Sequence, residues 1–200
     1  MSTAILPHPP RMSFEEFLEW ADEDTFAEWV DGEVLVMSSA SDRHQDLLGL
    51  LVACVRTFAE TTGAGAVRFG PYVMKIQGSA REPDLIFIAE EHRDRITKTF
   101  LDGPADLAVE IVSPDSRTRD RRDKLREYEA AGVREYWLID PEREEAEFYQ
   151  LEADGRYTSL PVAYGIVRSM VLPGLWLRLE WLWQEPLPPL LGVLKEWGLV

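Results

Sequence analysis

Two acids and a lysine lie where buried elements of this chain should end, and together they could hold a divalent metal ion. Glu110 interrupts the apolar run 107–112, which is typical of a strand covered on both faces. A carboxylate in such a place needs a cation or a proton to offset its lost hydration. Asp84 opens a second apolar run, 85–88, and Lys124 follows in a helical pattern. Carboxylates and an ammonium so placed are suited to metal-assisted attack on a phosphate.

Each of these three residues also has an ordinary structural explanation. Asp84 follows a proline and could be a turn residue at the entry to its strand. Glu110 could be protonated or paired with an arginine, and Lys124 could lie on the solvated face of a charged helix. The joint occurrence of all three favours a site.

The composition predicts one compact globular domain. The chain has 200 residues, of which 46% are hydrophobic, enough for a sizeable core. We expect one domain over 1–200, with an N-terminal helix and hairpin at 1–40, a core at 41–140, and C-terminal strands with an apolar tail at 141–200. Cys54 is the single cysteine, which excludes an internal disulfide and a cysteine-based zinc cluster.

The charge distribution bears on possible partners. The net charge of -15 argues against indiscriminate binding to nucleic acid. The segment 117–126 is nevertheless locally basic, and we name Arg117, Arg119 and Arg122 as candidate phosphate contacts. The N-terminus has no apolar core of signal-peptide length, and no uninterrupted apolar stretch is long enough to span a bilayer, so we expect a cytoplasmic protein without a membrane partner.

Two N-terminal elements offer accessory residues. Asp31-Gly32 predicts a hairpin over 28–36, and Glu28 and Glu33 flank its turn. Either acid could face the site, although an exposed position is expected of both. A helix should run from 41 or 42 to about 60, and His44 continues its apolar stripe toward the helix start. His44 is therefore either a core or cap residue or an accessory group of the site.

The centre of the chain predicts a crossover unit. The strand with Glu110 is followed by a helix that starts near 116 or 118 and ends before Gly132, and then by an apolar strand at 135–139. Lys124 lies one turn before Tyr128 and borders the buried stripe of that helix. Its ammonium can therefore turn inward. Strand, helix and strand in this order indicate an α/β fold.

Several stretches of the chain resemble the Uma-type family of restriction endonuclease-like bacterial proteins. The resemblance covers most of the chain and rests on Glu82-Pro83-Asp84, residues 106–114, Asp120 to Lys124 with Tyr128, and residues 131–140. It implies a nuclease of the PD-(D/E)XK superfamily, with a restriction-endonuclease-like core of a central mixed sheet flanked by helices, here with extra hairpins.

The resemblance also implies a site and a reaction. Asp84 and Glu110 would ligate Mg²⁺, for which Mn²⁺ could substitute, and the site would hydrolyse DNA phosphodiester bonds. The superfamily places a lysine two residues after the second acid, where this chain has Val112. Lys124, reaching in from the next helix, is the replacement that the family suggests. Magnesium prefers hard oxygen ligands, so the backbone carbonyl of Ile111 is a further candidate ligand.

Two other functions stay open at this point. The chain could be a catalytically inactive nuclease-fold protein that acts in nucleic-acid binding or assembly, or a metal-dependent hydrolase of another phosphoester. We expect a homodimer, because two symmetric sites cut two strands most simply and the tail at 174–197 offers apolar surface. The same tail could instead cover the core of its own chain.

Overall fold

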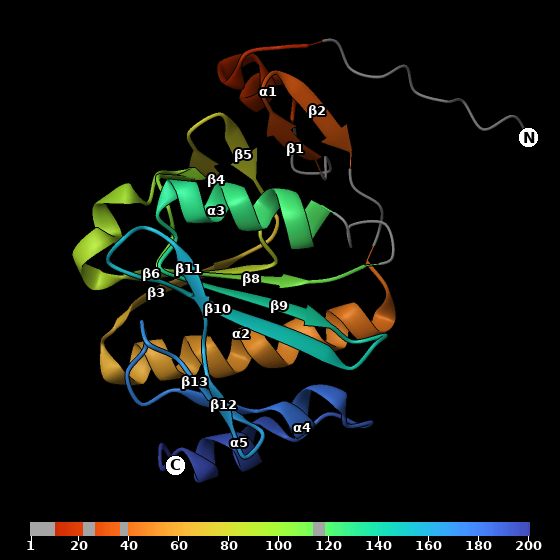
Figure 1. Ribbon diagram of the computed structural model, residues 1–200, viewed down its shortest axis with the longest axis vertical. Helices are drawn as coiled ribbons and strands as arrows, with labels where there is room; N and C mark the ends of the chain where they lie inside the picture. The colour runs from red at the N-terminus through yellow and green to blue at the C-terminus, as the bar shows by residue number, and fades with distance from the viewer. Residues whose placement is uncertain (1–10, 22–26, 37–39, 114–118) are drawn as a thin grey trace, which may run out of the picture.

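The computed structural model describes residues 11–21, 27–36, 40–113 and 119–200. Its central six-stranded sheet consists of β3 (Gly65–Phe69), β6 (Leu85–Ala89), β8 (Leu107–Ile111), β9 (Glu135–Asp140), β10 (Glu145–Leu151) and β11 (Tyr157–Ser159). The strand order is β11-β10-β9-β8-β6-β3. Helix α2 (Asp42–Thr62) covers one face of this sheet and α3 (Leu125–Ala131) covers the other (Figure 1). This is the mixed α/β architecture that the sequence predicts.

The strand directions decide which residues meet. Strands β8 and β9 are parallel, and the chain between them passes through the π-helical turn η2 (Arg119–Lys124) and α3, so the predicted crossover unit is confirmed. Strand β6 runs antiparallel to β8, with Leu85 opposite Val109. The start of β6 and the end of β8 therefore lie at the same end of the sheet, which brings Asp84 close to Glu110.

Apolar side chains on both faces explain the continuous hydrophobic runs of the central strands. Leu85, Val109 and Trp137 belong to the cluster on the α2 face, whereas Ile86 and Ala108 belong to the cluster on the α3 face. Alternate residues of a strand point to opposite faces, so a strand covered twice reads as apolar throughout. Glu110 shares the parity of Ala108 and points toward α3.

Helix α2 confirms its predicted start. The hydroxyl of Ser41 accepts a hydrogen bond from the backbone N–H of His44, at 3.2 Å, and the helix ends at Gly63, whose φ of 67° is left-handed. Such a side chain at the N-cap satisfies one of the unpaired N–H groups of the first turn. Cys54, on the buried side of α2, is 1% exposed and is a core residue.

The C-terminal tail packs on the other side of α2 (Figure 1). Its elements are β12 (Val162–Ala163), β13 (Ile166–Arg168), β14 (Trp176–Arg178), α4 (Leu179–Trp183) and α5 (Leu190–Glu196). Leu177, Trp181 and Val193 belong to the same hydrophobic cluster as α2 and the central sheet. The tail therefore covers the core of its own chain.

A second sheet, of five strands, lies beyond α3 (Figure 1) and combines the N-terminal hairpin with strands from the middle of the chain. It comprises β1 (Ala27–Val30), β2 (Glu33–Val36), β4 (Val73–Ile76), β5 (Ser79–Arg81) and β7 (Phe100–Asp102), in the order β2-β1-β5-β4-β7, with α1 (Phe14–Trp20) packed against it. Asp31 and Gly32 have φ values of 48° and 89°, as the predicted two-residue hairpin turn requires.

Strand β5 was not predicted from the sequence, because three residues are too short to show a period. It pairs with both β1 and β4 and thereby brings Arg81 next to the hairpin. A 3₁₀ helix, η1 (Glu90–Arg95), follows β6 at the opposite end of the central sheet from Asp84. Among the described residues, no helix is both long and apolar enough to cross a membrane.

Candidate functional site

Glu110 lies near the end of β8, is 4% exposed, and has the cation that its burial requires. The Nζ atom of Lys124 lies 2.8 Å from its Oε1 atom. The hydroxyl of Tyr128, one turn further along α3, donates to the same oxygen at 2.7 Å. The pairing residue is thus a lysine from the crossover helix rather than an arginine.

Lys124 points inward, as the helical spacing predicts. It ends η2, is 1% exposed, and lies 2.9 Å from Oε1 of Glu28 as well as close to Glu110. A lysine on the solvated face of a helix would have its ammonium in water. That alternative for Lys124 is therefore wrong.

Asp84 directly precedes β6 and links three parts of the fold. Its Oδ2 atom accepts a hydrogen bond of 2.6 Å from the backbone N–H of Ile111, beyond the last strand pair of β6 and β8. Its Oδ1 atom lies 3.1 Å from Nε2 of His44, on the first turn of α2. The structure therefore places His44 beside Asp84, where the imidazole can fix the orientation of the carboxylate.

The cluster of charged residues formed by Asp84, Glu110 and Lys124 also contains Glu28, which the sequence did not identify as a site residue. It was expected to be exposed, but it is 0% exposed, because Lys124 at the end of η2 and Arg81 of β5 lie against it. Burial alone would raise its pKa, but the charges of Lys124 and Arg81 outweigh burial and hold the pKa at about 2. Glu33 remains exposed and pairs with Arg11 at 2.6 Å, so the structure does not bring it into the cluster.

Arg81 connects Glu28 to the crossover helix. Its Nη1 atom lies 2.9 Å from Glu28, and its Nη2 and Nε atoms donate to the two carboxylate oxygens of Glu127 at 2.6 and 2.8 Å. Two parallel bonds of this kind fix both position and angle. Burial would lower the pKa of Arg81, but its hydrogen bonds to Glu127 and the charge of Glu28 raise it, so Arg81 stays charged.

The donor set of the cluster fits a divalent cation. Burial raises the pKa of Glu82 to about 7, and the charges of Glu28 and Asp84 act in the same direction. The charge of Lys124 acts against the rise. Asp84, Glu110, Glu28 and Glu82 supply carboxylate oxygens, the ligands that Mg²⁺ prefers in proteins.

The superfamily pattern places a lysine at position 112, where this chain has a valine. Val112 is 2% exposed, belongs to the core on the α3 face, and donates its backbone N–H to Ile139 at 2.7 Å. A lysine ammonium reaches the same carboxylate from Lys124 instead. The Ile111 carbonyl as a metal ligand stays a prediction.

The candidate phosphate contacts are only partly described. Arg117 lies outside the described residues, and Arg119 belongs to η2, but its side chain is not described. Arg122 is exposed on η2. Their neighbour Arg121 forms ion pairs within the chain, because its guanidinium lies 2.9 Å from Glu145 and 3.2 Å from Glu147.

A second group of possible metal ligands lies at the opposite end of the central sheet. Ligand atoms of Glu91, His92 and Asp106 lie within 4.8 Å of one another. The guanidinium of Arg134, however, is 3.1 Å from Glu91 and 3.3 Å from Asp106. Arg134 and His92 therefore already occupy the carboxylate oxygens of Asp106 that a metal would need.

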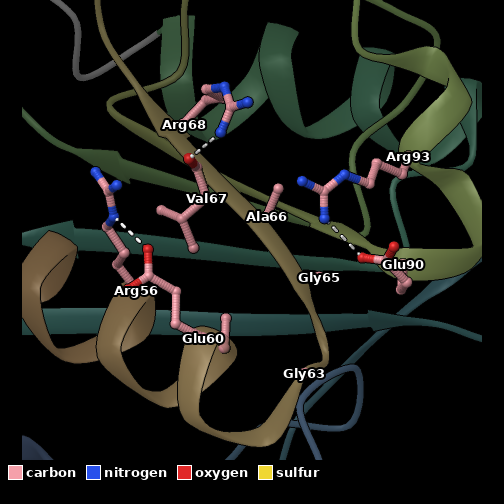
Figure 2. Close-up of a pocket in the computed structure, with 10 residues that line it drawn as sticks. Arg56, Glu60, Gly63, Gly65, Ala66, Val67, Arg68, Glu90 and Arg93 are labelled. Carbon is pink, nitrogen blue, oxygen red and sulfur yellow. Dashed lines mark hydrogen bonds and ion pairs between the residues drawn. The ribbon is translucent and has the colours of Figure 1, made fainter.

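Figure 2 shows a cavity of about 350 Å³ at that same opposite end, between the end of α2, β3 and η1. Arg56 pairs with Glu60, and Arg93 pairs with Glu90. Arg68 donates to the carbonyl of its neighbour Val67. Because two of its three arginines are paired, this cavity offers little net charge for an anion.

Comparison with known proteins agrees with this fold. Residues 14–180 match the Uma2 family, described as "putative restriction endonuclease". A crystal structure of a putative nuclease belonging to DUF820 from Anabaena variabilis ATCC 29413 is similar with a TM-score of 0.74 and 15% identity, over 86% of this chain and 97% of that chain. At this identity the likeness concerns the fold alone. No curated protein matches the chain.

Proposed function

Because this chain belongs to the Uma2 family of putative restriction endonucleases, we propose that it is a cytoplasmic, metal-dependent endonuclease that hydrolyses DNA phosphodiester bonds. The observation that carries the proposal is the buried ammonium of Lys124, 2.8 Å from Glu110. A lysine brought to a strand-end carboxylate, beside a second acid at Asp84, supplies the residue types that phosphodiester hydrolysis requires.

Each residue has a distinct task in the proposed reaction. Asp84 and Glu110, with the Ile111 carbonyl, hold Mg²⁺ or Mn²⁺. The metal, when bound, acidifies a water molecule and offsets negative charge on the phosphate. Lys124 orients the attacking water or stabilises the developing charge. His44 keeps the Asp84 carboxylate in one orientation through the 3.1 Å contact.

The basic start of the crossover helix supplies phosphate contacts outside the cluster. Arg122 is exposed on η2, two residues before Lys124. Arginine binds phosphate groups in two-pronged geometry and without regard to base sequence. We propose that Arg122, together with Arg117 and Arg119, guides the DNA backbone toward Lys124.

A cleavage assay with matched variants tests the function. Wild type should nick and linearise supercoiled plasmid in Mg²⁺ or Mn²⁺ and leave it intact with a chelator. Asp84→Asn should abolish cutting, whereas Asp154→Asn, in an exposed turn, should cut like wild type. Intact plasmid with wild type in both metals would contradict the endonuclease proposal.

The same assay distinguishes the two remaining functions. Wild type that binds DNA but never cuts it would favour the inactive binding or assembly protein. Hydrolysis of nucleotides or small phosphoesters without DNA cleavage would favour another metal-dependent hydrolase. We also propose a homodimer, since two symmetric sites cut both strands of a duplex most simply. Light scattering on the eluted protein should give twice the chain mass.

A further inference from the structure

Glu28 is the buried acid closest to Lys124 apart from Glu110, and it comes from a different sheet. Its Oε1 atom lies 2.9 Å from the Nζ atom of Lys124 and accepts the backbone N–H of Glu82 at 3.3 Å. Its Oε2 atom lies 2.9 Å from Nη1 of Arg81. Both carboxylate oxygens are therefore engaged, and one of them faces the proposed catalytic ammonium.

We propose that Glu28 is a positioning residue that holds the ammonium of Lys124 in its working direction. The proposal rests on the proposed function of Asp84, Glu110 and Lys124. It adds that the N-terminal hairpin is part of the reaction machinery, because the residue that aims Lys124 comes from β1.

Lys124 needs such a partner because of its side-chain chemistry. A lysine has a flexible four-carbon stem and three N–H donors without fixed geometry. Here one donor faces Glu110 on the central sheet, and another faces Glu28 on the five-stranded sheet. Two acceptors on separate elements restrict the ammonium far more than one acceptor does. Glu28 also stays ionised throughout the neutral range, since its pKa is about 2.

Glu28 is itself held in place by a closed chain of contacts. Arg81, 2% exposed, joins Glu28 to both carboxylate oxygens of Glu127. Ser79 donates to Glu127 as well, at 3.0 Å. Glu127 lies three residues after Lys124, so the contacts leave the crossover helix at Lys124 and return to it at Glu127. This arrangement fixes the distance between β1 and the segment that carries the lysine.

Single-turnover cleavage separates positioning from metal binding. Glu28→Gln should slow cleavage by about 100-fold, as expected when a catalytic group is displaced by about 1 Å. Its DNA affinity and its half-saturating Mg²⁺ concentration should stay at the wild-type values. The control is Glu19→Gln, an equal charge change at an exposed position on α1, and it should keep the wild-type rate.

A double variant shows whether Glu28 acts through Lys124. If it does, Glu28→Gln should cause no further slowing in a Lys124→Met background, because the two changes remove the same contribution. An additional loss in that background would overturn the proposal. So would a rate for folded Glu28→Gln within about threefold of wild type, or a raised Mg²⁺ requirement, which would make Glu28 a ligand.

A second readout does not depend on cleavage. Lysine acylation followed by peptide mass spectrometry should find Lys124 protected in wild type and in Glu19→Gln, with exposed Lys98 as the internal reference. In Glu28→Gln the acylation of Lys124 should be about tenfold faster or more, because loss of one anchor favours local opening. Unchanged protection of Lys124 in Glu28→Gln would overturn the positioning proposal, whether or not wild type cuts DNA. Failure of wild type to cut DNA would count against the proposed function alone.

Glu28→Asp keeps the test valid should Glu28→Gln fail to fold. It retains the charge that Arg81 requires but is one methylene shorter, so it cannot reach Arg81 and Lys124 in the same geometry. Slow cleavage and faster acylation of Lys124 are expected in the folded protein. Wild-type behaviour of Glu28→Asp in both assays would refute a positioning role.

Discussion

Buried acids gather at both ends of the parallel strands β8 and β9, and the partners of Glu135 at one end differ in kind from those of Glu28 and Glu110 at the other. At the end where these strands begin, Glu135 is 0% exposed and accepts hydrogen bonds from neutral groups. These are Nε1 of Trp137 at 2.6 Å and the backbone N–H groups of Met170 and Val171 at 2.7 and 3.1 Å. At the end where the strands finish, Glu28 and Glu110 share the ammonium of Lys124.

The two arrangements have opposite electrostatic consequences. Burial raises the pKa of Glu135, although its hydrogen bonds act against the rise. The pKa of Glu28 is lowered to about 2 despite equal burial, because Lys124 and Arg81 lie beside it. Neutral donors therefore tie the turn at Met170 to β9, whereas charged partners keep Glu28 ionised beside a cation. Only the second arrangement supplies charges that can act on a phosphate.

The largest effect should follow from removing the shared cation. Lys124→Met leaves Glu28 and Glu110 buried without it, and loss of one partner of a buried pair costs about 3–5 kcal/mol of unfolding free energy. Arg93→Met, at the other end, should cost under about 1 kcal/mol, because Arg93 and its partner Glu90 are both exposed and surface pairs contribute little. Urea unfolding of both variants checks this, and equal losses would remove the distinction between the two ends.

The pH dependence of stability should separate the two glutamates. Because folding lowers the pKa of Glu28 from 4.5 to about 2, its contribution is complete above pH 4.5 and is lost as the pH falls toward 2. The loss is on the order of 3 kcal/mol. Glu28→Gln should flatten this acid limb of the stability curve.

Glu135 should show the reverse sign. Because folding raises its pKa above 4.5, its ionisation destabilises the fold progressively as the pH rises above 4.5. Glu135→Gln should therefore become more stable relative to wild type as the pH increases. Urea midpoints across a pH series measure both glutamates, and parallel curves for the two variants would contradict their opposite environments.

Metal binding should occur at one end only. Mg²⁺ at about a hundred times its dissociation constant adds ~2.7 kcal/mol to the native state, which calorimetry records as a higher Tm. Glu110→Gln should abolish that rise. His92→Ala, in the second group of possible ligands, should leave it unchanged. If Glu110→Gln kept the rise in Tm and His92→Ala abolished it, the metal would bind at the Asp106 end instead.

The smallest effect concerns the path of the DNA. Arg122→Ala should reduce the slope of log binding constant against log salt by about 0.9, the value for one phosphate contact with duplex DNA. Arg93→Ala removes an arginine of the cavity in Figure 2 and should not change the slope. A reduced slope for Arg93→Ala alone would direct the DNA across the opposite end of the sheet.

The sequence by itself determined the elements that carry the site. The apolar run around Glu110, the proline before Asp84 and the spacing of Lys124 before Tyr128 are local patterns, because periodicity and turn residues act over a few positions. They also predicted the hairpin at Asp31-Gly32. His44 could be named as a candidate, since it continues the apolar stripe of α2.

Only the tertiary structure decided how the acids are partnered. Glu28 carries an ordinary hairpin pattern, and nothing near it in the chain shows that β5 will pair with β1 and that Lys124 will cover it. A pattern specifies which side of a strand is buried but not which distant residue lies against it. The same reason explains why Glu28 and Glu33, alike in sequence context, differ in role: one lies 2.9 Å from a buried lysine and the other pairs with an exposed arginine.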